Sequence, residues 1–187
     1  DHLPDNGPVN QRKLTYFVRR GDLLMIFVHT LCAEMGGEGY VELSWLAQTL
    51  AQHEDVKHKL VFGHHPVFSV NGFVGEHGRD VDSTLGASLW ALLVKHQVLA
   101  YVCSHILAFD VQIHDGVLQL LTAGAGTAHR MPEGVEYLHC VQAALDDNDL
   151  RYQVLDTDGT VREWLRWPLP TTPDDQWLPL LAKASQA

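Results

Sequence analysis

The feature that most constrains the fold is a strand, a helix and a second strand in direct succession over residues 60–103. Leu60-Val61-Phe62 is a short apolar run that ends in Gly63-His64-His65-Pro66. After a loop, Asp82-Ser83 supplies an N-cap for a helix with apolar residues at helical spacing, namely Leu85, Leu89, Leu92 and Leu93. The helix leads into the strand Val98–Cys103. Such a βαβ unit has parallel strands and a right-handed crossover, so the sequence predicts an α/β fold.

The segments before this unit predict a hairpin and a helix. Leu14–Arg19 and Leu23–Thr30 are β-rich runs separated by Arg20-Gly21-Asp22, and the apolar character of the second predicts a strand buried on both faces. A Gly-rich loop follows, and apolar residues at helical spacing then predict a helix near Val41–His53. Residues 1–13 are polar and predict an irregular lead-in.

From Phe109 onward the pattern changes to short strands joined by tight turns such as Asp115-Gly116 and Asp158-Gly159. These runs predict antiparallel strands of a second sheet: Val111–His114, Val117–Thr122, Tyr137–Leu145, Leu150–Asp156 and Val161–Trp167. The tail, residues 168–187, holds four of the eight prolines and predicts a linker with a short helix around Trp177–Lys183. We therefore expect one domain over residues 1–167.

Composition excludes several classes of protein. With 187 residues, 46% of them hydrophobic, the chain can fill a core. Its 13 basic and 23 acidic residues give a net charge of −10, which supplies no attraction for nucleic acid or anionic lipid. No apolar run approaches the roughly 20 residues of a membrane span. We therefore expect neither a nucleic acid nor a membrane as partner.

Cysteine and histidine usage bears on redox state and metal binding. Three scattered cysteines are too few for a disulfide framework, and their odd number favours reduced thiols. Reduced thiols point toward the cytoplasm, although the sequence does not otherwise set the localisation. Twelve histidines keep metal binding open, since imidazole is the commonest protein ligand for zinc-like ions.

Two histidines stand where ligands collect in α/β proteins. His64 directly follows one strand of the βαβ unit, and His105 follows the other, in Ser104-His105-Ile106-Leu107. The carboxyl ends of parallel strands lie at one edge of the sheet, so both imidazoles are expected in one crevice, where they can bind one ion. The alternative is that both are ordinary histidines hydrogen-bonded to loop carbonyls.

At these residues the chain resembles the calcineurin-like metallophosphoesterases, the superfamily that includes the purple acid phosphatases. The resemblance runs from about Leu14 to Trp167. It rests on an ordered series of segments: the strand Leu23–Thr30, the helix with Ser44-Trp45-Leu46, Val61-Phe62-Gly63-His64-His65-Pro66, Ser104-His105 and Leu121-Thr122-Ala123-Gly124-Ala125-Gly126. It implies the carboxyl half of a two-sheet sandwich with helices outside, in which the βαβ unit is followed by antiparallel strands.

The resemblance also implies a chemistry. Members of this family hydrolyse phosphate esters at a pair of divalent metal ions, here zinc, manganese or iron, that activate a hydroxide and neutralise charge on phosphate. By position, His64 corresponds to a metal ligand and His65 to a catalytic neighbour close to the substrate. His105 corresponds to the first His of the family's Gly-His-x-His motif.

The sequence also departs from the family pattern. Leu107 occupies the second His of that motif, and Ser104 replaces its Gly, whose backbone angle the turn would need. No Asp-x-His, Gly-Asp-x-x-Asp or Gly-Asn-His segment occurs, so most of the family's metal ligands are absent. Asp110, five residues beyond His105, is a candidate replacement ligand or, alternatively, a turn cap.

Asp1-His2 fits the end of a Gly-Asn-His-Asp motif, which suggests the carboxyl half of a longer protein; a chance polar start is the other interpretation. A fold without the N-terminal strands would expose a parallel edge and an apolar face. The expected macromolecular partner is therefore a missing N-terminal half or another protein that covers this region.

We expect a metal-dependent phosphoesterase-type hydrolase domain that is incomplete or degenerate in this chain. The alternative is a catalytically silent binding or assembly module that keeps the fold. The motifs do not decide whether the chain by itself is an enzyme. If it is active, the expected substrate is a phosphate ester.

Several other groups have simpler interpretations. Gly124-Ala125-Gly126-Thr127 is either an anion cradle or a tight loop. Asp146, Asp147 and Asp149 read as a solvated hairpin, and Cys103 as inert core rather than a nucleophile. The remaining candidates are interpreted as surface or packing residues: His77, His96, His114, His129 and His139.

Overall fold

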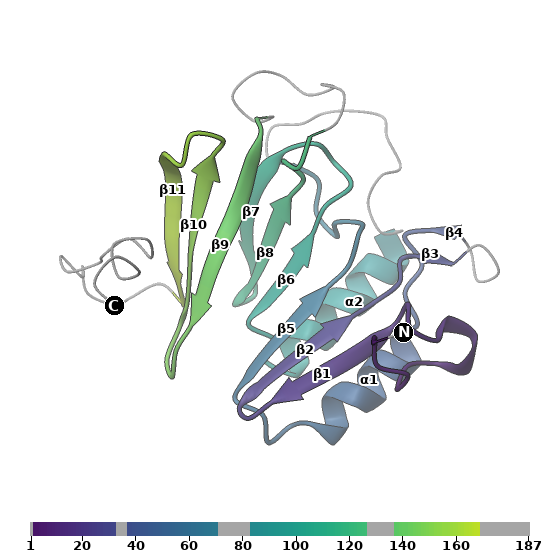
Figure 1. Cartoon of the computed structure of the whole chain (residues 1–187). Helices are drawn as coiled ribbons and strands as arrows, with labels where there is room; N and C mark the ends of the chain where they lie inside the picture. The colour runs from purple at the N-terminus through teal and green to yellow at the C-terminus, as the bar shows by residue number, and fades with distance from the viewer. Residues whose placement is uncertain (1, 33–36, 71–82, 127–136, 169–187) are drawn as a thin grey trace.

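The computed structural model describes residues 2–32, 37–70, 83–126 and 137–168, without the side chains of residues 32, 37, 38, 83 and 84 (Figure 1). The predicted helix at 177–183, His77, His129, Asp82 and Thr127 lie outside the described residues. The elements, in chain order, are η1 (Val9–Gln11), β1 (Tyr16–Arg20), β2 (Leu23–Phe27), β3 (Leu31–Cys32), β4 (Gly37–Glu38), α1 (Leu43–Gln52), β5 (His58–Phe62), α2 (Ser83–Lys95), β6 (Ala100–Cys103), β7 (Phe109–His114), β8 (Val117–Thr122), β9 (His139–Leu145), β10 (Leu150–Asp156) and β11 (Val161–Trp167).

The predicted βαβ unit is confirmed and lies at the centre of a six-stranded sheet with the order β1-β2-β5-β6-β8-β7. β5 and β6 are adjacent and parallel, with Leu60 opposite Ala100 and Phe62 opposite Val102. The predicted hairpin is also present, because β1 pairs antiparallel with β2. The Gly-rich segment was expected to be only a loop, but Gly37–Glu38 within it forms β4, which pairs antiparallel with β3.

The assignment of all later strands to a second sheet is wrong for β7 and β8. These two strands are antiparallel to each other, but β8 runs parallel to β6 and so joins the six-stranded sheet. A tight turn determines only which two strands pair within the hairpin. Because β8 is apolar and buried, it can also pair with a parallel strand on its other side. Only β9, β10 and β11 form the second, antiparallel sheet.

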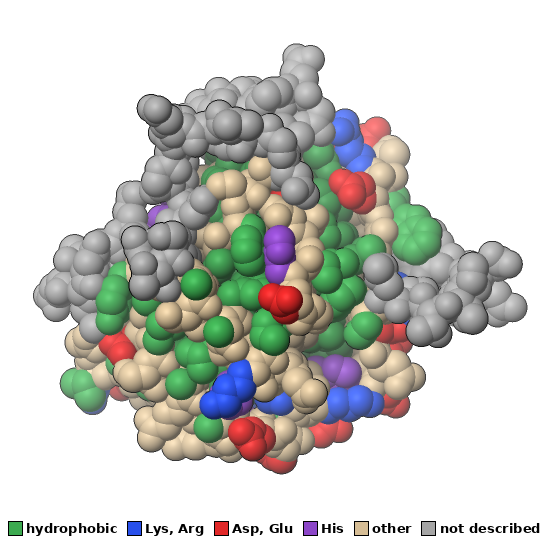
Figure 2. All heavy atoms as spheres, turned by 180° about the vertical axis from the view of Figure 1, so that it is seen from behind, with side chains coloured by type: hydrophobic (Ala, Val, Ile, Leu, Met, Phe, Trp, Pro, Cys, Tyr) green, Lys and Arg blue, Asp and Glu red, His purple; other side chains and the backbone are tan. Residues whose placement is uncertain are grey.

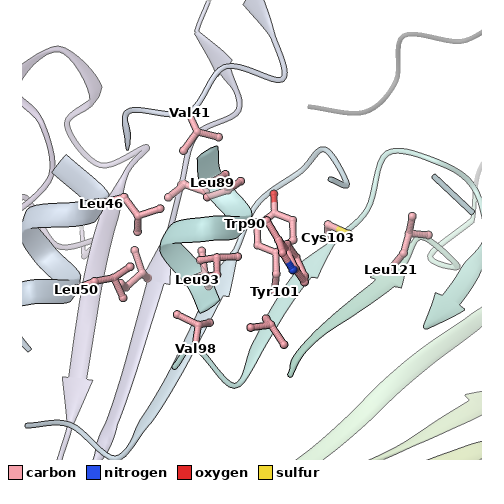
Figure 3. Close-up of a cluster of buried hydrophobic side chains, with 14 of the residues drawn as sticks. Val41, Leu46, Leu50, Leu89, Trp90, Leu93, Val98, Tyr101, Cys103 and Leu121 are labelled. Atoms are coloured by element: carbon pink, nitrogen blue, oxygen red, sulfur yellow. The ribbon is translucent and has the colours of Figure 1, made fainter. Parts of the chain in front are cut away.

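Both helices pack on one face of the large sheet. Leu46 and Leu50 of α1 and Leu89 and Leu93 of α2 are completely buried against the sheet, together with Tyr101 of β6 (Figure 3). The i, i+4 spacing of these leucines gives each helix one apolar stripe, which is what the periodicity predicted. Cys103 is buried in this core, as expected.

The three-stranded sheet packs on the opposite face. Leu150, Tyr152 and Val154 of β10 contact a second apolar cluster that includes Leu60 and Leu118. The Trp167 indole Nε1 at the end of β11 donates a hydrogen bond to the carbonyl oxygen of Leu99, 2.9 Å away, which joins the two sheets. The result is a two-sheet sandwich with helices outside, as the resemblance implied.

The second sheet leaves part of its face of the large sheet open. In β2, Leu24 and Ile26 are buried under the helices, whereas Met25 and Phe27 on the other face are only half-buried. The expectation that this strand is buried on both faces is therefore wrong. The expected parallel edge is also absent from the described part of this sheet, because its outer strands β1 and β7 are both antiparallel to their neighbours.

The acidic hairpin between β9 and β10 is not simply solvated. Asp149 is only 3% exposed, and it forms ion pairs with Arg166 of β11 and, at 3.6 Å, with Arg151 of β10. A buried carboxylate needs such partners because desolvation penalises an unpaired charge. Asp146 and Asp147 are exposed, as predicted.

Among the described residues, neither helix has the length and apolar character needed to cross a bilayer. On the face seen in Figure 2, lysine and arginine side chains lie near acidic ones.

Candidate metal centre

The loops after β5 and β6 bring His64 and His105 together. The parallel register continues past the strand ends, since Gly63 N–H donates to the Val102 carbonyl at 3.0 Å and Ser104 N–H to the His64 carbonyl at 3.0 Å. The imidazole rings lie 4.8 Å apart, with His64 Nε2 2.9 Å from His105 Nδ1. The predicted convergence of these side chains is confirmed, while their role as metal ligands stays a prediction.

His65 completes a cluster of three imidazoles. Its ring centroid lies 4.3 Å from that of His105, and one ring nitrogen from each of His64, His65 and His105 lies within 4.8 Å of the others. We expected His65 to be a catalytic residue near the substrate; its side chain is fully buried in the structure. This position makes it a third candidate ligand, which the sequence reasoning missed.

Two buried residues from neighbouring strands hold His65 in place. Thr30, just beyond β2, places its Oγ1 2.8 Å from His65 Nδ1 and accepts a hydrogen bond from the His65 backbone N–H at 3.3 Å. Tyr101 donates its hydroxyl to the His65 carbonyl at 2.7 Å, and burial raises the pKa of this phenol well above its usual value, so it remains a neutral donor. Thr30 ended a predicted strand, but nothing in the pattern showed that it would face His65.

The special backbone angle in the second loop belongs to His105 and not to Ser104. His105 has a φ of 68°, in the left-handed region that is unfavourable for residues with a Cβ. We expected the replacement of Gly by Ser at position 104 to crowd the turn, but Ser104 is not among the residues with positive φ. The residue with the unusual angle is thus itself a member of the histidine cluster.

A cavity of about 380 Å³ opens beside the histidines. His64, His105 and Leu107 line it from one side, and Gly124 and His139 from the other. Leu107 therefore borders the space next to the histidines, as its position in the motif implied. The cavity gives the site room for a small ligand.

His139 has a defined place in this wall and is not a surface residue. Its Nδ1 lies 2.8 Å from the Tyr137 carbonyl, which can only accept, so Nδ1 carries the proton; Nε2 lies 3.0 Å from Thr122 Oγ1. A Cβ at Gly124 would come within 2.0 Å of the ring. Gly124 is thus needed for close approach of His139, which favours the tight-loop interpretation of Gly124–Gly126 over the anion cradle.

Asp110, the candidate replacement ligand, is not part of the histidine cluster that the described residues form. It accepts a hydrogen bond from Gln112 Nε2 at 2.7 Å. It also lies near Glu163 of β11, whose pKa is raised by burial first and by the Asp110 charge second. The structure therefore pairs Asp110 with Gln112 of the same strand and leaves it outside the histidine cluster.

The chemistry of the cluster fits a divalent transition metal. Neutral imidazole suits zinc, iron and copper, and three protein ligands with an open fourth position are typical of catalytic zinc sites. Thr30 Oγ1 lies beside His65 Nδ1, and a hydrogen bond to one ring nitrogen usually orients a histidine that binds metal through the other.

Comparison with known proteins supports the fold. No family model matches the sequence, and no curated protein matches it. Among solved structures, a purple acid phosphatase from yellow lupin (Lupinus luteus) superposes with a TM-score of 0.63 at 14% identity over 85% of this chain and 33% of its own. GAP50, described as the anchor in the inner membrane complex of Plasmodium, superposes with a TM-score of 0.61 at 14% identity over 81% of this chain and 52% of its own.

The chain thus spans about half of one of these structures and a third of the other. At 14% identity the match concerns architecture only. The two-sheet sandwich, the order of its strands and these matches show that the chain has the fold of the calcineurin-like metallophosphoesterases.

Proposed function

We propose that this chain is a metal-dependent phosphoesterase-type hydrolase domain whose histidine centre binds one divalent metal and whose ligand set is incomplete for hydrolysis. The observation that carries the proposal is the convergence of three imidazoles from the loops after two adjacent parallel strands. Zinc, manganese and iron are the candidate metals, and zinc fits the imidazole donors best.

Each residue of the centre has a separate part. His64 and His105 would bind the metal from the rim of the cavity, and His65 from its buried side. Thr30 and Tyr101 fix the His65 ring and backbone. A bound divalent metal would supply the polarisation of a phosphate oxygen and the activation of water. The cavity beside Leu107 would admit the phosphate ester.

Incompleteness follows from the ligand count. Within the described residues the cluster contains no carboxylate, and a two-metal mechanism needs bridging and terminal oxygen ligands in addition to imidazoles. Leu107 provides no lone pair at the cavity wall.

A catalytically silent binding or assembly module is the second candidate. It is favoured by Leu107 at a ligand position and by the likeness to GAP50, which is described as an anchor rather than as an enzyme. On this hypothesis the chain keeps the fold, and the histidines are packing residues.

Zinc titration of the purified chain by calorimetry separates the two candidates. We expect one zinc ion per chain, and we expect His64→Ala to lower the zinc affinity by more than the roughly 10- to 100-fold lost when a residue that only orients a ligand is changed. His96→Ala is the control, because it removes an imidazole that lies just after α2 and outside the histidine cluster. Absence of zinc binding would contradict the proposal and leave the silent module.

Hydrolysis of p-nitrophenyl phosphate with zinc, manganese or iron tests the second half of the proposal. We expect no measurable turnover by this chain alone. Metal-dependent turnover that disappears in His64→Ala would show that the ligand set is complete and that the chain is itself an enzyme.

A further inference from the structure

A hydroxyl and an imidazole meet on the cavity wall outside the histidine cluster. Thr122, the last residue of β8, and His139, the first residue of β9, both line the cavity of about 380 Å³. Thr122 Oγ1 lies 3.0 Å from His139 Nε2. Neither residue belongs to the cluster of candidate metal ligands among the described residues, and the proposed function uses neither of them.

The direction of this hydrogen bond follows from the other side of the imidazole ring. His139 Nδ1 lies 2.8 Å from the Tyr137 carbonyl oxygen, which can only accept, so Nδ1 carries the proton of the neutral ring. Nε2 then has a lone pair, to which Thr122 donates its hydroxyl. A hydroxyl that donates to an imidazole, whose other nitrogen is oriented by an acceptor, is the arrangement that activates a hydroxyl nucleophile.

Packing holds the His139 ring in this orientation. The residue is only 7% exposed. The ring of Phe109 lies nearly perpendicular to the imidazole with centroids 5.5 Å apart, and the ring of Tyr137 lies 4.8 Å away. The His139 backbone N–H also donates to the Gly124 carbonyl at 3.0 Å, which ties it to the loop after β8. A base held in this way is already positioned to accept a proton.

Thr122, in contrast, can be reached from the cavity. It is half-buried and forms part of the cavity wall. Its oxygen has two lone pairs besides the proton donated to His139, so it can attack a bound group. The contact between Thr30 and His65 differs, because Thr30 is 1% exposed and its oxygen already accepts a hydrogen bond from the His65 backbone N–H.

The residues that line the cavity indicate the class of substrate. Among the described lining residues there is no Lys, Arg, Asp or Glu, while Leu107, Ala123 and Ala125 supply apolar surface. Without a bound metal, a phosphate dianion would find no cationic side chain there, and an unpaired charge is costly to desolvate. A small neutral ester carries no such cost. Esters with a weakly basic leaving group fit best, because they demand least of the nucleophile.

We infer that Thr122 and His139 form a catalytic pair that hydrolyses small neutral carboxylic esters. Thr122 Oγ1 attacks the ester carbonyl carbon, and its proton passes to His139 Nε2. The bond from the carbonyl carbon to the leaving oxygen breaks, and His139 gives the proton to that oxygen. Water, with His139 again as the base, then cleaves the acyl-threonine and restores the hydroxyl. This activity is separate from the proposed phosphoesterase function and needs no metal.

The test is hydrolysis of p-nitrophenyl acetate by the purified full chain with a chelator present. Thr122→Val removes the hydroxyl at similar shape, Thr122→Ser keeps a hydroxyl, and His139→Gln removes the base. Thr157→Val is the matched control, because the Thr157 hydroxyl donates to Asp156 and not to a histidine. Peptide mass spectrometry after an acid quench locates the acetyl group, and circular dichroism checks that each variant is folded.

We expect turnover that falls at least about 100-fold in Thr122→Val and in His139→Gln, within the usual contribution of a general base. Turnover should persist in Thr122→Ser and be unchanged in Thr157→Val, and the acetyl group should lie on Thr122. If a variant does not fold, the location of the acetyl group in the native chain decides.

Three results would overturn the inference. The native chain would hydrolyse the ester no faster than free histidine at the same concentration, Thr122→Val would keep the native rate, or the acetyl group would lie on the exposed Cys140. Because the chelator removes metal from this assay, its outcome is independent of the zinc titration that tests the histidine centre.

Discussion

The two ends of β5 and β6 show how differently one fold uses histidine. At the carboxyl ends, His64, His65 and His105 come from two separate loops and lie against one another beside a cavity. At the amino-terminal side, His96 just after α2 is 7% exposed and lies 3.8 Å from Glu54, and Lys59 donates to the Val56 carbonyl at 2.7 Å.

This difference follows from the topology. At the amino-terminal side, His96 lies near Glu54 and Lys59 bonds the Val56 carbonyl, and neither belongs to the cluster of candidate ligands found among the described residues. At the carboxyl ends, parallel strands direct two loops to the same point, and their side chains meet each other. Burial of a histidine is therefore not evidence of a site, whereas convergence from separate strand ends is.

The largest expected effect is on the free energy of unfolding, and it comes from the close packing at the carboxyl ends of β5 and β6. In Gly63→Ala the new Cβ would come within 2.2 Å of the Tyr101 hydroxyl oxygen, which also holds the His65 carbonyl. We expect the free energy of unfolding, measured in urea, to fall by about 1–3 kcal/mol, the usual cost of overpacking.

The same substitution in a Tyr101→Phe background provides the control. Without the hydroxyl, the closest contact is removed, so Gly63→Ala should cost less there. An equal cost in both backgrounds would show that Tyr101 does not set the space at this end of the strands.

Leu107→His sharpens the contrast by adding a fourth imidazole to the cavity wall. If Leu107 occupies a ligand position, zinc affinity should rise about tenfold, equivalent to about 1.4 kcal/mol, and zinc should raise the melting temperature only when His64 is present. If Leu107 is an ordinary packing residue, the variant should melt at a lower temperature and its melting should not respond to zinc.

The smallest effect is expected from His96 and appears in the pH dependence of stability. Burial, and next the charge of Lys95, lower the pKa of His96 below its usual 6.5. The unfolded chain therefore binds a proton more readily, so His96 should reduce stability as the pH falls below 6.5 and have no such effect above it.

His96→Gln cannot bind this proton. Urea unfolding at several pH values, with a chelator present, should show a shallower loss of stability below pH 6.5 for the variant than for the native chain. If the free energy of unfolding falls equally with pH in the variant and the native chain, the folded protein does not keep His96 neutral.

Much of the architecture was predictable because its signals are local. Helical spacing of Leu46 and Leu50, and of Leu89 and Leu93, located both helices within a few residues. The order of strand, helix and strand predicted that β5 and β6 are parallel, and hence that His64 and His105 would converge. The placement of β8 was not predictable, because a strand's sequence does not say which neighbour it will pair with.

The sequence by itself thus determined the elements, their order and the two histidines at matching strand ends. Only the tertiary structure decided that His65 joins them, that Thr30 and Tyr101 hold it, and that His139 lies in the cavity wall. Periodicity records which face of its own element a residue occupies, a property of a few neighbouring residues. Which side chains from distant elements meet depends on strand order, loop conformation and packing, which are set by the whole chain at once.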